Sequence, residues 1–174
     1  MIQTGTDRTV YVVQGEYRVS AKPDEVLSTL LGSCVAVCLW DPVGRVGGMN
    51  HFLLPFGPDG AKDGSMRYGV HAVEILINDL LCNGARRDRL RAKLFGGARM
   101  SARLRDIGTA NAAFARDYLK TEDIACIAES LGGNSARRVV FRPTTGQARQ
   151  MLVPDAIVEE ATTAPRNQDD VTLF

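Results

Sequence analysis

The hydrophobic and polar positions of this chain fall into short runs that predict more strands than helices. The richest stretch, residues 26–55, holds two apolar, β-rich runs separated by Asp41-Pro42-Val43-Gly44. Asp, Pro and Gly at the first, second and fourth positions are typical of a type I turn. The pattern therefore predicts a β-hairpin across this stretch.

Further strands are expected along the rest of the chain. They are two short strands around Gly15 within 9–20, single strands at 90–95 and 124–129, and a hairpin formed by 137–142 and 147–153. A helix is expected over 66–83, with Val70, Val73, Ile77, Leu80 and Leu81 on one face and Gly84 as its C-terminal cap. A second helix is expected over about 110–121, with Ala113, Phe114 and Tyr118 toward the core.

Because strands outnumber helices and several form hairpins, we expect an α+β fold, an α/β sandwich of mostly antiparallel sheets covered by helices. The 174 residues fit a single domain, 1–174, with its core at about 10–153. Periodicity is lost after Pro154, so residues 154–174 are expected to form a flexible C-terminal tail.

Composition narrows the function classes. The formal net charge is +1 and the charged fraction 24%, which gives no strong attraction to nucleic acid or membrane surfaces. No apolar run approaches the roughly 18 residues of a membrane-spanning helix. The N-terminal residues have no apolar signal core. We therefore expect a soluble, cytoplasmic protein that binds no nucleic acid and does not insert into membranes.

Four cysteines are present, at positions 34, 38, 82 and 126. None belongs to a Cys-x-x-Cys pair, and neither histidine lies near a cysteine cluster, so we expect no metal and no cofactor. A reducing compartment also disfavours disulfides. Most of these cysteines are expected to be small core residues.

The predicted hairpin brings Cys34 toward His51. With Pro42-Val43 as a two-residue loop, Cys34 lies directly opposite His51, where Cβ atoms are about 4.5–5.5 Å apart. A three-residue loop with a bulge at Gly44 instead places His51 opposite Val35, and a second bulge at Gly47-Gly48 could shift the register again. Spacing therefore brings the two side chains close without proving contact, and a core cysteine beside a half-buried histidine is the alternative.

A thiol beside an imidazole suggests nucleophilic chemistry. A free thiol has a pKa of about 8.5, so a neighbouring base is needed to activate it near neutral pH. Gly32-Ser33 allow a tight chain path before Cys34, with backbone N–H groups available as an oxyanion hole. Ser28, Thr29 or a backbone carbonyl could hold the ring, and Cys38 has the same strand parity as Cys34.

At these residues the chain resembles CheD, the chemoreceptor glutamine deamidase family of bacterial and archaeal chemotaxis. The resemblance rests on LGSCVAVCLWDPVGRVGGMNHFLLP (31–55), KLFGGARM (93–100), DIGTANAAF (106–114), ESLGGNSARRVVF (129–141) and TTGQARQ (144–150). It implies a fold similar to the catalytic domain of cytotoxic necrotizing factor toxins, with the family nucleophile on Cys34 and its histidine on His51. The family's third group, a threonine six residues before the cysteine, falls on Ser28, beside Thr29.

The resemblance also implies an activity and partners. The chain would be a protein-glutamine glutaminase that converts receptor glutamines to glutamates through a Cys34 thioester, with glutamyl methylesterase activity as a side reaction. Methyl-accepting chemotaxis proteins would be its substrates and a CheC-type phosphatase a further partner. For the oligomeric state, a monomer is the default expectation. A cysteine peptidase and a non-catalytic chemotaxis adaptor are the rival hypotheses.

Two departures from the family pattern are Ala110, where the family has arginine, and Ser130, where it has aspartate. They are expected to affect contacts with partners more than bond cleavage. His71 is expected to be partly exposed and not catalytic. The basic cluster 86–91 is expected to be a solvated loop, with docking to an acidic receptor bundle as the sharper hypothesis.

Overall fold

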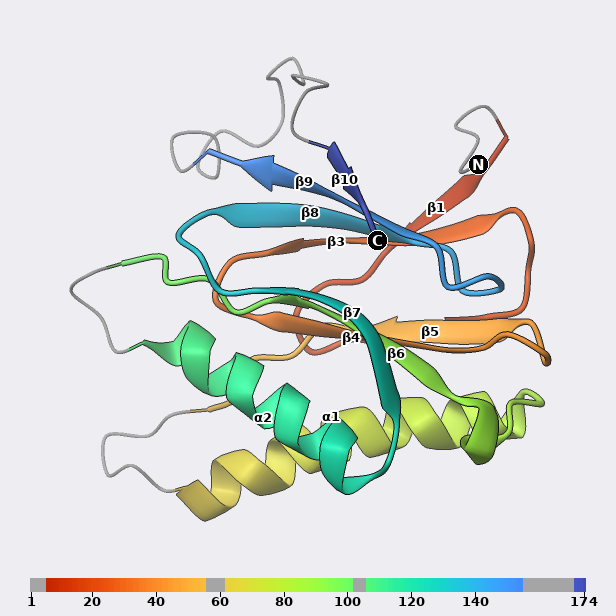
Figure 1. Ribbon diagram of the computed structural model, residues 1–174, viewed down its shortest axis with the longest axis horizontal. Coiled ribbons are helices and arrows are strands. Elements are labelled where there is room, and N and C mark those ends of the chain that lie inside the picture. The colour runs from red at the N-terminus through yellow and green to blue at the C-terminus, as the bar shows by residue number, and fades with distance from the viewer. Residues whose placement is uncertain (1–5, 56–61, 102–105, 155–170) are drawn as a thin grey trace.

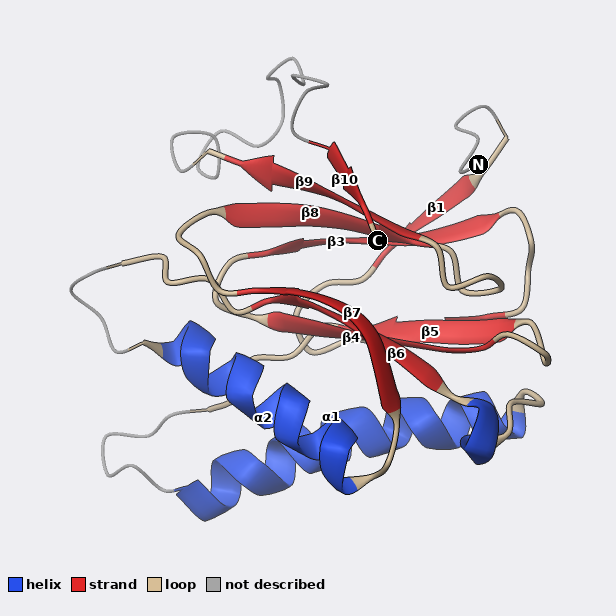
Figure 2. Ribbon diagram, in the orientation of Figure 1, coloured by secondary structure: helices blue, strands red, loops and turns tan. Residues whose placement is uncertain are grey.

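The computed structural model describes residues 6–55, 62–101, 106–154 and 171–174. Two five-stranded sheets lie face to face, and two helices pack beneath the second sheet (Figures 1 and 2). The first sheet has the order β1 (Arg8–Tyr11), β3 (Glu25–Leu31), β8 (Ala136–Phe141), β9 (Ala148–Val153), β10 (Val171–Leu173). The second has the order β2 (Tyr17–Ser20), β5 (Val46–Asn50), β4 (Val35–Asp41), β6 (Arg91–Gly96), β7 (Ala125–Leu131).

Most neighbouring strands are antiparallel, and the parallel pairs are β1 with β3 and β6 with β7. The predicted α+β sandwich is therefore confirmed. Helices cover only the second sheet, because each helix has one apolar face and the first sheet packs its inner face against the second.

The helices are α1 (Lys62–Cys82) and α2 (Ile107–Thr121), close to the predicted ranges. Gly84 has φ +98° and the N–H of Ala85 donates to the carbonyl of Leu80, so the predicted cap is confirmed. The predicted face was wrong at Leu81, which is 37% exposed, while Leu76 is fully buried. Successive helical residues lie 100° apart, so Leu80 and Leu81 cannot both face the sheet. On α2, Ala113 likewise faces solvent.

Two chain crossings between the sheets matter for function. The apolar run 26–40 looks continuous in sequence, yet it bends at Gly32-Ser33-Cys34 and enters the first sheet as β3 and the second as β4. The expected pair of strands around Gly15 also divides, with β1 in the first sheet and β2 in the second. Gly15 has φ +88°, which glycine adopts without strain. The crossing at Gly15 lies beside His51, because the N–H of Gly15 donates to the His51 carbonyl. The other crossing leads into Val35, which exchanges two backbone hydrogen bonds with Phe52, the residue after His51.

The hairpin of β4 and β5 is confirmed, but its predicted register was wrong. Asp41 lies opposite Val46 and Cys38 opposite Met49, so the loop has four residues rather than two or three. The Asp41 carboxylate accepts hydrogen bonds from the N–H groups of Val43 and Gly44, which extends the turn. Arg45, not Gly44, then adopts the left-handed conformation, with φ +53°.

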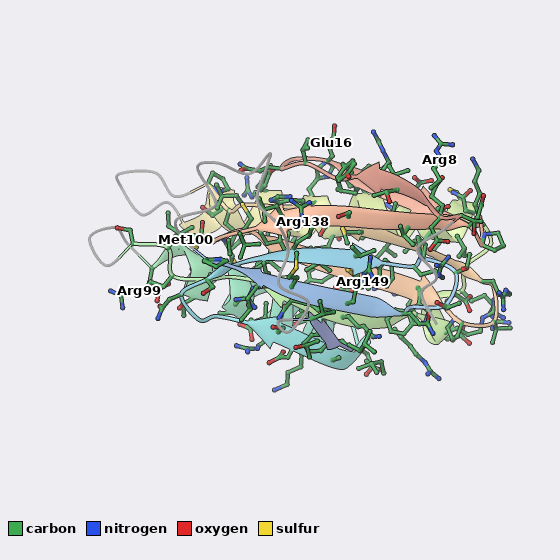
Figure 3. The ribbon with its side chains drawn as sticks, turned by 90° about the horizontal axis from the view of Figure 1, so that it is seen from above. Arg8, Glu16, Arg99, Met100, Arg138 and Arg149 are labelled. Carbon is green, nitrogen blue, oxygen red and sulfur yellow. The ribbon has the colours of Figure 1, made fainter. Side chains whose placement is uncertain are left out.

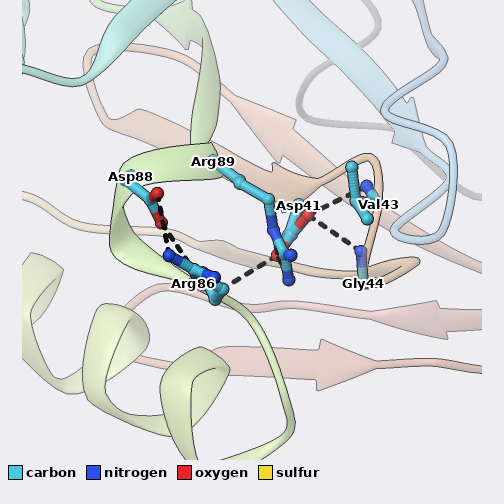
Figure 4. Close-up of polar contacts among 6 residues, drawn as sticks. All are labelled: Asp41, Val43, Gly44, Arg86, Asp88 and Arg89. Carbon is cyan, nitrogen blue, oxygen red and sulfur yellow. Dashed lines mark hydrogen bonds and ion pairs between the residues drawn. The ribbon is translucent and has the colours of Figure 1, made fainter.

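Asp41 is completely buried and ties this hairpin to the segment after α1 (Figure 4). Its second carboxylate oxygen accepts from the N–H of Arg86 and from the Arg89 guanidinium, each at 2.9 Å. Burial by itself raises the pKa of Asp41, but the bonds from Gly44, Arg86, Arg89 and Val43 outweigh it and lower the pKa to about 2.

Asp41→Asn should lower the free energy of unfolding by about 2 kcal/mol at pH 7, because asparagine keeps only one accepting oxygen and its NH₂ group cannot accept from the second pair of donors. A depressed carboxyl pKa stabilises the fold above the unfolded value of about 3.9 and loses that effect as pH falls toward 2. Urea unfolding from pH 7 to 2 measures this. The variant should lose less stability than wild type below pH 4, and Asp88→Asn, in an exposed pair, should change little. Equal stability of Asp41→Asn and wild type would contradict the prediction.

The end of the chain differs from the expected flexible tail. Val171–Leu173 form β10 on β9, and Phe174 packs edge-to-face on Phe95 with ring centroids 5.4 Å apart. The Lys93 ammonium, largely buried, donates to the Phe174 carbonyl at 2.7 Å. A buried ammonium needs an acceptor, which helps to fix these last residues. The remainder of the predicted tail, 155–170, lies outside the described residues.

Candidate functional site

Cys34 lies at the crossing from β3 to β4, where the chain passes close to the end of β6. The N–H of Gly97 donates to the Cys34 carbonyl at 2.8 Å, and the N–H of Ala98 to the Gly32 carbonyl at 2.9 Å. Gly96 has φ +112°, and a Cβ there would lie 2.1 Å from the Cys34 carbonyl oxygen. Glycine at position 96 therefore allows the close approach of this backbone to Cys34.

Asn111 on α2 fixes the cysteine loop from below. Its side chain is fully buried, donates to the Ser33 carbonyl at 2.8 Å and accepts from the N–H of Leu54 at 3.0 Å. One amide thus joins the segment before Cys34 to the segment after His51. Sequence reasoning gave Asn111 no role, although a polar residue on the apolar face of a predicted helix was a signal that could have found it.

His51 follows β5 and lies on the same face of the sheet as Cys34. The pairing continues beyond the strands, since Val35 and Phe52 exchange two backbone hydrogen bonds. In this register Ala36 faces His51 and Leu53 faces Cys34. The predicted direct opposition was wrong by two residues, which preserves the face. Diagonal neighbours of this kind have Cβ atoms about 7–8 Å apart, within reach of long side chains.

The hydroxyl beside the imidazole belongs to Thr29. Its Oγ1 lies 2.8 Å from His51 Nδ1 and 2.6 Å from the Val12 carbonyl oxygen. A carbonyl can only accept, so the single hydroxyl proton points to Val12. Nδ1 must then carry a proton and donate it to Thr29, which leaves Nε2 unprotonated in the neutral ring. Nδ1 also lies 3.4 Å from the Val12 carbonyl, which agrees with this tautomer.

Ser28, expected as the third group, lies on the opposite face of β3 from Thr29, because successive strand residues alternate. Its partner in β8 is Val140, which is paired in turn with Arg149 of β9. Figure 3 looks down on that outer face and labels Arg149 on it. Thr29 instead pairs with the buried Val139. The geometry thus corrects the expectation based on spacing to the cysteine, and the ring is held by the neighbouring residue.

Burial dominates the electrostatics of the site. It lowers the pKa of His51, an effect that the Val12 carbonyl partly offsets. Burial also raises the pKa of the Cys34 thiol, with a smaller opposing effect from the backbone N–H of Cys34. Both shifts favour the uncharged forms of the thiol and the imidazole.

Two further groups complete the surroundings of the thiol. The Cys34 Sγ donates to Gln14 Oε1 at 3.7 Å, from the loop between β1 and β2. Within residues 6–55, 62–101, 106–154 and 171–174, the N–H groups of Ser33 and Cys34 donate to no backbone carbonyl. These donors are therefore available to an incoming oxygen atom.

The other residues singled out from the sequence lie outside this site. Cys38 is fully buried, and burial strongly raises the pKa of its thiol. Cys82, Cys126 and His71 are exposed. Ser130 accepts a hydrogen bond from the buried Arg137, which gives it a structural contact.

The basic cluster 86–91 is largely neutralised by acidic partners. Arg86 pairs with Asp88, Arg87 with Glu122 and Arg89 with Asp41. This pairing weakens the hypothesis that the cluster docks an acidic bundle. Across the described part of the chain, no three potential ligand side chains gather to hold a metal ion. No helix there is long and apolar enough to cross a membrane.

Cysteine-dependent hydrolases use a thiol, an imidazole oriented by a hydroxyl and backbone N–H donors. All three kinds of group lie here at the crossing between the two sheets. Comparison with known proteins specifies the family. The family model CheD, described as CheD chemotactic sensory transduction, matches residues 53–151. This chain belongs to the CheD family.

Curated relatives agree over most of the chain. A probable chemoreceptor glutamine deamidase CheD of Caulobacter vibrioides is 56% identical over 145 residues, 83% of this chain and 78% of that protein. Proteins with the same description from Rhizobium meliloti and Rhizobium rhizogenes are 55% and 53% identical, covering 88% and 100% of this chain and 85% and 100% of theirs. Among solved structures, a Neisseria meningitidis protein of family model DUF152 is 14% identical with a TM-score of 0.45, covering 74% of this chain and 64% of that one.

Proposed function

We propose that this protein deamidates glutamine side chains of methyl-accepting chemoreceptors, with Cys34 as nucleophile, His51 as base and Thr29 as the group that orients the ring. The names of the relatives support the substrate class. The observation that carries the residue roles is the hydrogen bond of 2.8 Å between Thr29 Oγ1 and His51 Nδ1. It leaves Nε2 as the basic nitrogen on the face that Cys34 shares.

The first half of the reaction forms a thioester. His51 Nε2 takes the thiol proton as Cys34 Sγ bonds to the side-chain amide carbon, and the carbonyl oxygen becomes an oxyanion facing the N–H groups of Ser33 and Cys34. The imidazolium then gives its proton to the amide nitrogen. The carbon–nitrogen bond breaks and ammonia leaves, with the acyl group held on sulfur.

The second half releases glutamate. His51 takes a proton from water, whose oxygen attacks the thioester carbon, and the carbon–sulfur bond breaks as the proton returns to sulfur. A glutamyl methyl ester would enter the same route with methanol as leaving group, which gives the methylesterase side activity. Each turnover adds a negative charge to a receptor helix and so changes helix–helix repulsion. We further propose that the protein works in the cytoplasm as a monomer and binds a CheC-type phosphatase where one exists.

The test incubates purified protein with a chemoreceptor cytoplasmic fragment and follows the mass of its peptides. Each converted glutamine should gain about 1 Da and release one ammonia. Peptides with internal backbone cleavage would favour a peptidase, and an unchanged fragment that still binds the protein would favour an adaptor.

The pH profile should report the lowered pKa of His51. The base acts only when neutral, so kcat/KM should stay level as pH falls through the ordinary histidine value of about 6.5 and decline at lower pH. Initial rates from pH 4.5 to 9 measure this, with unfolding followed in parallel. An acid limb centred above 6.5 would mean that the ring is charged at rest, contrary to its burial.

A further inference from the structure

We infer that Gln14 is a further catalytic residue, whose side-chain amide donates to the oxyanion formed at Cys34. This inference rests on the proposed deamidation chemistry and adds a residue to it. Gln14 is the side chain that the Cys34 thiol contacts, through Sγ and Oε1 at 3.7 Å. Nothing in the family resemblance or in the strand spacing pointed to it.

The loop that carries Gln14 is held in place by the catalytic histidine segment. The N–H of Gly15 donates to the His51 carbonyl at 2.8 Å, and the N–H of His51 donates to the Glu16 carbonyl at 3.1 Å. Glu16 also closes the turn through its N–H to the Val13 carbonyl. The backbone that follows Gln14 is thus fixed to His51, and the turn bond from Glu16 to Val13 closes the loop on its other side. The amide therefore stays near the sulfur while remaining exposed to an incoming substrate.

The resting contact changes when charge develops. With a neutral thiol, Oε1 of Gln14 accepts the S–H proton. Once that proton moves to His51, sulfur can no longer donate, and an amide oxygen facing it is repelled. Rotation about the last side-chain bond, which has a broad and roughly two-fold torsional profile, then turns the NH₂ group toward the reacting atoms.

An amide at this position can reach the right atom. The oxyanion is bonded to the carbon that is itself bonded to Sγ, so a donor beside the sulfur lies beside the oxyanion too. The NH₂ group would add to the N–H donors of Ser33 and Cys34. Because the amide donates only after charge has formed, it stabilises the transition state more than the resting complex, and this difference raises kcat.

Two variants of similar side-chain length separate donation from shape. Gln14→Met keeps the reach and removes the donor, and Gln14→Glu keeps the reach and adds a negative charge. We expect kcat to fall roughly 10- to 100-fold in Gln14→Met and further in Gln14→Glu, with KM changed less than about threefold. Val13→Ala, an exposed neighbour on the same turn, is the matched control and should retain wild-type rates.

A second measurement does not depend on receptor turnover. A short capped peptide carrying glutamate γ-semialdehyde in place of glutamine should add to Cys34: sulfur bonds to the aldehyde carbon, the thiol proton moves to His51, and the oxygen becomes the oxyanion. The dissociation constant of this adduct should rise in Gln14→Met by the same factor as kcat falls. Tighter or equal binding by the variant would overturn the inference.

Failure of the proposed function looks different. If wild type adds the aldehyde but leaves receptor glutamines unchanged, the substrate assignment fails, and the weaker adduct of Gln14→Met still supports the donor role. A loss confined to KM, or a kcat of Gln14→Met within about twofold of wild type, would overturn the donor role. Conversion of Gln14 itself to glutamate in wild type, seen as a mass gain in its peptide, would overturn it as well, since the amide would then be a substrate.

Discussion

Cys34→Ala should abolish deamidation of a chemoreceptor fragment, with a loss in kcat of at least about 10⁴-fold. Without sulfur no acyl intermediate can form, and the remaining donors can only polarise a bound amide toward water. Replacement of a cysteine by alanine at this 9% exposed junction removes one atom and leaves the surrounding backbone hydrogen bonds in place. Peptide masses and ammonia release, measured against wild type over the same hours, give the result.

The matched control is Cys82→Ala, which removes an exposed thiol near the end of α1 and should keep full activity. Circular dichroism and urea unfolding establish that both variants are folded. Deamidation by folded Cys34→Ala at a rate within about tenfold of wild type would exclude Cys34 as the nucleophile.

Thr29→Val should lower kcat by about 10²-fold while the protein stays folded. Valine matches threonine in shape but lacks the hydroxyl. The N–H at Nδ1 of His51 then loses its acceptor, and the Val12 carbonyl loses its donor. The ring can then move its proton to Nε2, which removes the basic nitrogen that the proposed mechanism requires. Thr29→Ser keeps a hydroxyl and should retain most activity.

Ser28→Ala tests the competing assignment. Ser28 is buried but lies on the face of β3 turned away from the ring, so its loss should leave kcat unchanged within about twofold. The ring itself can be followed by NMR: the nitrogen shifts of His51 should report a proton on Nδ1 in wild type and a mixture of tautomers in Thr29→Val. A large loss in Ser28→Ala with an unaffected Thr29→Val would reverse the two roles.

Local sequence patterns were sufficient for most secondary structure. The hairpin of β8 and β9, the strands β6 and β7 and both helices lie near the predicted ranges, because apolar periodicity and Gly, Pro or Asp turns act over a few residues. The predicted element boundaries and buried faces were wrong where contacts between distant parts of the chain determine them. Leu81 is exposed because the helix packs on the sheet through its opposite side. Val171–Leu173 form a strand because they pair with the edge of β9.

The site divides in the same way. The sequence by itself determined the family through its motifs, and it predicted the pair Cys34 and His51 through that resemblance, while their catalytic roles stay a prediction. It could not determine the register of their hairpin, because the Asp41 carboxylate lengthens the loop by hydrogen bonds that also involve Arg86 and Arg89, far along the chain. The face survived this error because the shift was two residues, the period of a strand.

Only the tertiary structure decided which hydroxyl holds the ring. Ser28 and Thr29 are adjacent and chemically alike, and the choice depends on which face of β3 meets the second sheet. That choice is made by packing of the whole sandwich, together with the β1–β2 crossing that brings Val12 and Gln14 to the site. Spacing along the chain predicts which residues are neighbours within one helix or strand. Side chains from separate chain crossings come together only when the two sheets pack.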